Sequence, residues 1–208
     1  MFLFRPVGLE ELRLIYEADL KGFPPRLPDQ PIFYPVLNQR YASKMAKEWN
    51  TKAGSRAGFV TRFEVEDRYL ARFERRVVGS QEHEELWVPA EELLTFNEHV
   101  IGSVHVVEAY FGEGYQGAVP DAFGLKGKTA HEQFVALART IDYSSFDVSC
   151  ELAANHMVVF LNFFLWACGD FLADGIGAVE RDSVLWRLRA FWSQGQRASL
   201  PLGLARIG

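Results

Sequence analysis

The hydrophobic pattern of this chain changes near its middle, and this change constrains the fold more than any other feature. Up to about Phe111, alternating segments typical of strands mix with short helical patterns, whereas from Thr129 onward only helical periodicity is found. A glycine-rich segment, residues 112–127, separates the two parts as interdomain connectors do. We predict an α+β domain with a split, mainly antiparallel sheet over residues 1–111 and a small all-helical domain over residues 128–208.

The second part contains a segment, Met157–Cys168, that is apolar on nearly all sides. Its 12 residues are too few to cross a bilayer, since a membrane-spanning helix needs about 20. We therefore predict a buried helix around 151–171 and no membrane partner, with a membrane-inserting hairpin as the alternative. Flanking helices with one apolar stripe each cover only part of such a helix. The rest is expected to meet the sheet domain or a second copy in a homodimer.

The two neighbouring helices of this part are also predicted from local signals. Thr129 and Glu132 have the spacing of a capping box, and Val184 and Leu188 belong to the apolar stripe of the last helix.

Composition describes an ordinary globular chain. The 208 residues carry a net charge of −5, which argues against nucleic-acid binding driven by bulk charge. The N-terminus lacks the pattern of a secretory signal. Cys150 and Cys168 fit neither a disulfide framework nor a metal site, so buried, reduced thiols in a cytoplasmic protein are expected.

The first part begins with a predicted strand, Phe2–Val7, which ends at Pro6 or lies at a sheet edge. A helix to about Leu20 follows, then the proline-rich loop 23–31, which cannot be helical. Ile32–Tyr34 is a short strand, and Asn38 is a suitable N-cap for a helix whose apolar face includes Tyr41 and Trp49.

The later elements of this part are mostly strands. Strands are predicted at 59–65, at roughly 69–78, at 84–89 and at 101–111, with a helix from Pro89 to about His99.

The strand 84–89 (EELWVP) is unusual because it starts with two carboxylates. Alternation places Glu84 with Leu86 on one face and Glu85 with Trp87 on the other. A glutamate beside an indole is either solvated at an edge strand or used in chemistry, and this hexapeptide alone leaves both interpretations open.

Three motifs in order resemble the signature of the ADP-ribosyltransferase-like superfamily. These are Phe4-Arg5 on the first strand, Phe33-Tyr34 leading into a helix, and Glu85 on a late strand. The resemblance covers residues 1–111 and implies a split-sheet fold that binds NAD in a cleft. A looser association is with proteins labelled ADP-ribosylation/crystallin J1, whose all-helical fold the strand-rich half does not resemble.

The resemblance also implies roles. Glu85 would stabilise the positive charge that develops when the nicotinamide–ribose bond breaks. Arg5 would bind a ribose or phosphate, Tyr34 would stack on nicotinamide, and Arg26 and Tyr41 complete the expected cofactor-binding set. We expect Arg5, Tyr34 and Glu85 to line one cleft, and Glu85→Gln to abolish NAD turnover with little loss of stability.

The pattern departs from the family in two ways. Arginine-modifying members carry Glu or Gln two positions before the catalytic glutamate, where this chain has His83. A register shifted by one residue would instead pair Glu82 with Glu84, so Glu84 is a second candidate catalytic residue. An arginine combined with a tyrosine strand is a hybrid of two known signatures.

The leading functional hypothesis is an NAD-dependent mono-ADP-ribosyltransferase, such as a toxin or defence enzyme, whose helical part contacts a macromolecular acceptor or a neutralising partner. The alternatives are a non-catalytic binding module of the same fold and a different enzyme, either an ADP-ribose hydrolase or a nucleic-acid-processing enzyme. No metal is expected, because alternation places His105 and Glu108 on opposite faces of their strand.

Overall fold

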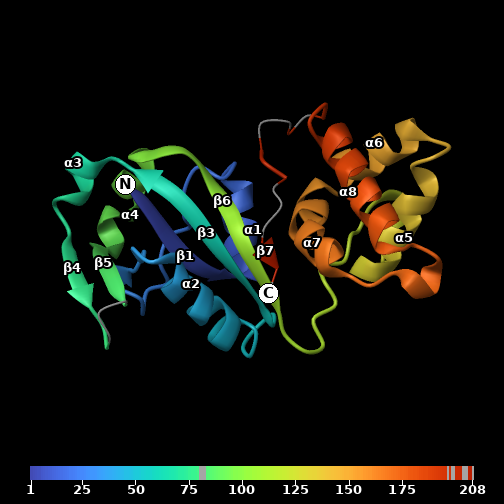
Figure 1. Cartoon of the computed structure of the whole chain (residues 1–208). Coiled ribbons are helices and arrows are strands. Elements are labelled where there is room, and N and C mark those ends of the chain that lie inside the picture. The colour runs from blue at the N-terminus through green and yellow to red at the C-terminus, as the bar shows by residue number, and fades with distance from the viewer. Residues whose placement is uncertain (80–82, 196, 198–199, 203–205, 208) are drawn as a thin grey trace. The chain divides into compact units, whose positions relative to one another are not determined.

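The structure, a computed structural model, describes residues 1–79, 83–195, 197, 200–202 and 206–207 (Figure 1). The strands are β1 (Phe2–Gly8), β2 (Ile32–Phe33), β3 (Ala57–Val65), β4 (Glu74–Val77), β5 (Glu84–Pro89), β6 (Val100–Phe111) and β7 (Arg206–Ile207). The helices are α1 (Leu9–Glu17), α2 (Gln39–Met45), α3 (Asp67–Leu70), α4 (Leu93–Glu98), α5 (Ala130–Thr140), α6 (Ser145–Ala154), α7 (His156–Cys168) and α8 (Ala178–Trp192).

The chain divides into two compact units, Met1–Glu113 and Gly114–Ile207. The first unit holds two small antiparallel sheets and the second holds helices α5 to α8, so the predicted α+β class is confirmed. The predicted connector differs in one respect. Residues 114–127 group with the second unit because polar side chains of α5 and α7 bind their backbone, as described below.

One sheet of the first unit places β1, β3 and β6 side by side, and the other has the order β2-β5-β4. Val36 joins the two sheets. It exchanges two backbone hydrogen bonds of 2.8 Å with Phe4 of β1, and it pairs with Glu85 of β5 on its other side. Pro6 does not end β1, which continues to Gly8. The expected edge position accounts for this, because the side of β1 away from β3 pairs with Val36 at Phe4 and Pro6 lies beyond that bridge.

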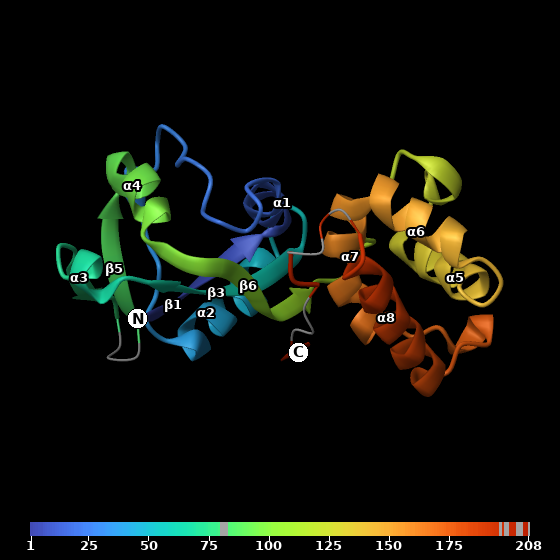
Figure 2. The same ribbon diagram turned by 90° about the horizontal axis from the view of Figure 1, so that it is seen from above.

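Two helices pack on opposite sides of the β1–β3–β6 sheet (Figure 2). The α1 side contains the larger core, in which the rings of Phe23, Phe33, Phe63 and Phe96 contact one another. On the other side, α2 packs through Ala42 against a smaller apolar cluster that includes Val36 and Val60.

The local signals around α2 are partly confirmed. The Asn38 side chain accepts a hydrogen bond of 2.8 Å from the Arg40 amide, as expected of an N-cap. Beyond Met45 the helix widens into a π-helical turn, Ala46–Asn50, and Trp49 is 65% exposed. Its predicted place on the apolar face is wrong, because the wider turn breaks the 3.6-residue period.

The predicted strand 69–78 is also too long. Its first residues form the helical turn α3, with the Tyr69 ring stacked on His99 at 3.9 Å, and only β4 is extended. The predicted helix after Pro89 begins with a 3₁₀ turn and continues as α4.

In the second unit the capping box of α5 is confirmed, since Thr129 and Glu132 each accept a hydrogen bond from the other's backbone amide. The stripe of α8 is confirmed as well, with Val184, Leu185 and Leu188 buried. The single helix predicted around 151–171 is broken at Asn155 into α6 and α7, which meet at 105°.

Helix α7 is the most apolar element of this unit. Its side chains from Val159 to Phe164 and that of Trp166 are buried, and Cys168 alone is exposed. Among the described residues, no single helix is long and apolar enough to cross a membrane, and α6 and α7 meet that criterion only together as a bent pair. The homodimer inferred from the apolarity of α7 stays a prediction.

Asn162 of α7 attaches the segment before α5 to the helices. Its side chain accepts a hydrogen bond from the Ala118 amide at 2.7 Å and donates to the Ala118 carbonyl at 2.8 Å. It also donates to Gln133 Oε1 at 2.9 Å. Gly117 leaves room for this amide, because a Cβ there would lie 2.7 Å from Asn162 Oδ1. Fully buried Asn162 therefore serves a structural purpose.

We expect Asn162→Leu to lower the free energy of unfolding by about 2–4 kcal/mol, because it leaves the half-buried Ala118 amide and the buried Gln133 Oε1 without this partner. Urea denaturation followed by circular dichroism measures this loss. The exposed Gln194→Leu is the matched control and should change stability by less than about 0.5 kcal/mol. A similar small effect at Asn162 would contradict the structural assignment.

Candidate functional site

Strand pairing determines which side chains of the β2–β5–β4 sheet share a face. Glu85 pairs with Arg76 on one side and Val36 on the other, and directly paired residues point the same way. Alternation then extends this surface along each strand. We call this surface the Glu85 face. Its residues are Ile32, Tyr34 and Val36 from β2 and the segment after it, Glu85, Trp87 and Pro89 from β5, and Glu74 and Arg76 from β4.

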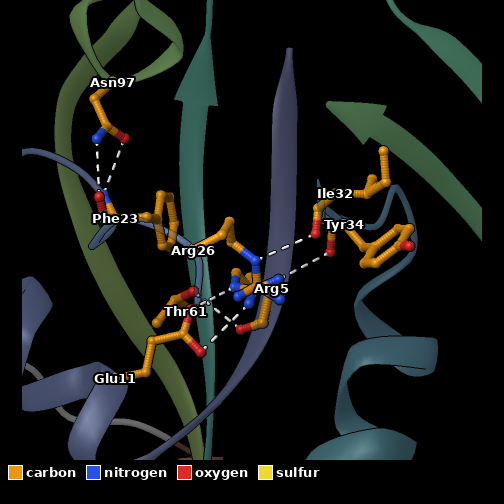
Figure 3. A network of polar contacts seen from close by, with 8 residues as sticks. All are labelled: Arg5, Glu11, Phe23, Arg26, Ile32, Tyr34, Thr61 and Asn97. Atoms are coloured by element: carbon orange, nitrogen blue, oxygen red, sulfur yellow. Dashed lines mark hydrogen bonds and ion pairs between the residues drawn. The ribbon is translucent and has the colours of Figure 1, made fainter. Parts of the chain in front are cut away.

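Arg5 lies on the opposite face. Its neighbour Phe4 pairs with Val36, so alternation along β1 directs Arg5 away from Glu85. The guanidinium, on a residue only 7% exposed, binds Glu11 of α1 through Nε at 2.6 Å and Nη2 at 3.3 Å. Nη1 donates to the Tyr34 carbonyl at 3.3 Å. Figure 3 shows this network, in which the Tyr34 ring points away from Arg5. The prediction that Arg5 and Glu85 line one cleft is therefore wrong.

Arg26 belongs to the Arg5 network and not to the Glu85 face. Its Nε donates to the Ile32 carbonyl at 3.2 Å, beside Arg5 (Figure 3). Burial and the neighbouring charge of Arg5 lower the pKa of Arg26. These two expected cofactor-binding residues are close together, but they contact Glu11 and backbone carbonyls on the side opposite the predicted catalytic glutamate.

Glu85 itself is buried, at 9% exposure, and Tyr41 of α2 donates a hydrogen bond of 3.0 Å to its Oε1. The ring of His83 stacks on Tyr41 with centroids 4.1 Å apart. Burial, and then the hydrogen bond to Glu85, raises the pKa of Tyr41 to about 12. The protonated phenol donates to one oxygen of Glu85 and so orients the carboxylate.

Two aromatic rings lie on the same face of the sheet as this carboxylate. Tyr34 meets Trp87 edge to face, with ring centroids 5.3 Å apart, and the Arg76 guanidinium lies 3.8 Å from the centre of the Trp87 ring. A pocket of about 410 Å³ continues the face from these residues. Its lining consists of Ile32, Arg72, Phe73, Glu74, Arg76, Trp87, Pro89 and Glu92.

Trp87, Arg76 and Arg72 were not predicted as site residues. Trp87 was recognisable from its alternation with Glu85, since both must share a face. The two arginines have no comparable signal, because the predicted strand 69–78 is longer than β4 and the sequence alone does not set the register of β4 against β5.

Glu84 lies on the other face by alternation, and its carboxylate is 3.9 Å from Arg75. Glu82, its partner in the shifted register, lies outside the described residues. Glu85 is not the accessible carboxylate that the sequence predicts, because it is buried and accepts the Tyr41 hydrogen bond. Glu85→Gln replaces a charged acceptor by a neutral one, so we expect a measurable loss of stability of about 1 kcal/mol.

The arrangement combines a carboxylate, two aromatic rings and Arg76 on one face with Arg72 in the pocket that continues it. A carboxylate next to aromatic rings suits a planar cation, and arginines suit phosphate oxygens. The nicotinamide ring and pyrophosphate of NAD have these properties. Among the described residues, no group of three His, Cys, Asp or Glu side chains is placed to hold a metal ion. Cys150 and Cys168 are free, but the expectation that they are buried is wrong, because Cys150 is half-buried and Cys168 exposed.

Comparison with known proteins does not add to this description: the chain matches no family model, no curated protein and no solved structure.

The raised pKa of Tyr41 predicts a pH dependence. The phenol of the unfolded chain ionises near pH 10, and that of the folded chain near pH 12. The folded state therefore holds one more proton between these values, so the Tyr41 contribution to stability is complete below pH 10 and decreases up to pH 12. Urea midpoints of the wild type and Tyr41→Phe should converge over this range. The exposed Tyr143→Phe is the control, and a constant Tyr41→Phe difference would contradict the assignment.

Proposed function

We propose that the sheet domain is a non-catalytic NAD-binding module that uses the Glu85 face. The observation that carries this proposal is the convergence of Glu85, the Tyr34–Trp87 pair and Arg76 on one face, while Arg5 lies on the other. Glu85 and Tyr34 are the acidic and aromatic residues expected of an ADP-ribosyltransferase-like site, and the expected Arg5 is displaced from it. We also propose a cytoplasmic location, which the two cysteines without a disulfide pattern predict.

Each part of NAD has a partner of suitable chemistry on this face. The positively charged nicotinamide ring fits beside the Glu85 carboxylate and the aromatic pair. Arg72 and Arg76 line the adjoining pocket, and Arg72 provides donors for the pyrophosphate. Arg72 is 56% exposed and lies 3.5 Å from Glu92, so a phosphate can replace this weak pair at small cost.

Binding without catalysis is favoured by the state of Arg5. In the family that the sequence resembles, the arginine of the first strand helps to hold NAD in the cleft of the glutamate. Here Arg5 is buried, bound to Glu11 and separated from Glu85 by the sheet itself. A guanidinium in a two-point ion pair of this kind does not leave it for a ligand on the far face.

Calorimetric titration with NAD and with ADP-ribose tests the proposal. Glu85→Gln should weaken NAD binding about tenfold, equivalent to about 1.4 kcal/mol, because the carboxylate opposite the pyridinium is lost. ADP-ribose lacks that ring and should bind both proteins equally. The matched control is Glu84→Gln, a neighbouring glutamate on the other face, which should leave both affinities unchanged. Equal effects of the two substitutions, or no NAD binding by the wild type, would contradict the proposal.

A second candidate, an NAD-dependent mono-ADP-ribosyltransferase, is favoured by one observation: Arg76 pairs with Glu85 across β4 and β5 and could replace Arg5. In this reaction the nicotinamide–ribose C–N bond breaks and its electron pair leaves with nicotinamide. Glu85 stabilises the positive charge on the ribose, and the acceptor adds there with loss of a proton.

Nicotinamide release and self-modification by the purified protein separate the two candidates. If the protein is a transferase, Glu85→Gln should lower the rate about 100-fold or more, whereas Glu84→Gln should retain it. If it is a binding module, the wild type should release nicotinamide no faster than Glu85→Gln does.

A further inference from the structure

We infer that Trp87 is the platform for a planar cationic ring and that the Arg76 guanidinium occupies the position of that ring in this structure. The inference deepens the proposed NAD binding, on which it rests, by naming the class of ring that the site selects: a positively charged pyridinium over a neutral ring of the same shape.

The geometry of Arg76 supports the inference first. Its guanidinium carbon lies 3.8 Å from the centre of the Trp87 ring, the separation of a stacked planar cation. A guanidinium and a pyridinium are both flat, delocalised and singly charged, and each is attracted by the electron-rich face of an indole. The two groups therefore compete for the same surface.

Arg76 is held weakly enough to be displaced. Its side chain is 43% exposed, and its ion pair with Glu74 at 2.7 Å is between two exposed residues of the edge strand β4. Exposed pairs of this kind contribute little, and a cation–π contact at an exposed site changes an affinity only about two- to fivefold. A ligand cation can therefore take the place of Arg76 on the ring at small cost.

The indole N–H does not take part in this recognition. Trp87 Nε1 is shielded from solvent, and none of the described residues accepts its hydrogen bond. It lies in the plane of the indole, so a cation stacked on the ring does not reach it. Recognition therefore rests on the face of the ring, which attracts a planar cation more than a neutral ring of the same shape.

The test uses 1-methylnicotinamide, which is cationic, and nicotinamide, which is neutral and has the same ring and amide. Neither contains phosphate, so any role of Arg76 in phosphate binding does not enter. Two-dimensional NMR titration of the labelled protein follows the Trp87 indole N–H signal, identified by its loss in Trp87→Phe. The wild type should bind the cation more tightly than the neutral ring.

Arg76→Gln removes the competing cation from an exposed position and should fold normally. We expect it to bind 1-methylnicotinamide about threefold more tightly or better, with nicotinamide changed much less. Arg75→Gln is the matched control, because it removes the same charge from the next residue of β4, whose side chain points to the opposite face. It should leave both affinities as in the wild type.

The outcomes separate this inference from the proposed function. The relevant quantity is the affinity for 1-methylnicotinamide divided by that for nicotinamide. If NAD binds in a Glu85-dependent way and Arg76→Gln leaves this ratio unchanged, or lowers it, the inference is wrong and the proposed function stands. If the wild type binds neither NAD nor 1-methylnicotinamide, both are wrong. An effect of equal size in Arg75→Gln would assign the change to bulk charge and also overturn the inference.

Discussion

The two backbone hydrogen bonds between Phe4 and Val36 are the interaction on which the arrangement of the first unit depends. They connect the β1–β3–β6 sheet to the β2–β5–β4 sheet through one residue, and they fix the register between β1 and β5. Because side chains alternate with a period of two, this register alone separates Arg5 from Glu85. If β1 were shifted by one residue against Val36, Arg5 would lie on the same face as Glu85.

Much of the fold follows from local sequence signals. The N-cap at Asn38, the capping box at Thr129 and the strand at 100–111 are all determined by neighbouring residues, and all are present. The elements that differ depend on longer-range geometry. The π-helical turn after Met45 and the break at Asn155 have no strong local signal, since neither glycine nor proline lies there.

The candidate site shows the same limit more sharply. Alternation predicts that Glu85 and Trp87 share a face, which is the case, but it cannot predict which face of another strand lies beside them.

The pairing of β3 with β6 is a second case in which alternation alone predicts the wrong face. A shift between Val60 and Thr61 places Glu108 and His105 opposite Val60 and Arg62, which share a face. The expectation that Glu108 and His105 face opposite ways is therefore wrong, because a β-bulge breaks the period.

Glu85 and Glu108 both connect the sheets to α2, and this gives Glu85 two functions. Glu108 accepts hydrogen bonds from Gln39 at 2.7 Å and from Ser43, while Glu85 accepts one from Tyr41 on the same helix. A carboxylate that positions a helix is itself positioned by it, so its orientation requires no rearrangement when a cation arrives. The same coupling means that removing the charge of Glu85 must also loosen α2. Affinity for a pyridinium and stability of the α2 packing should therefore decrease together at Glu85. At Arg76, whose hydrogen bond to Glu74 and stacking on Trp87 both lie within the sheet, affinity should change without loss of the α2 packing.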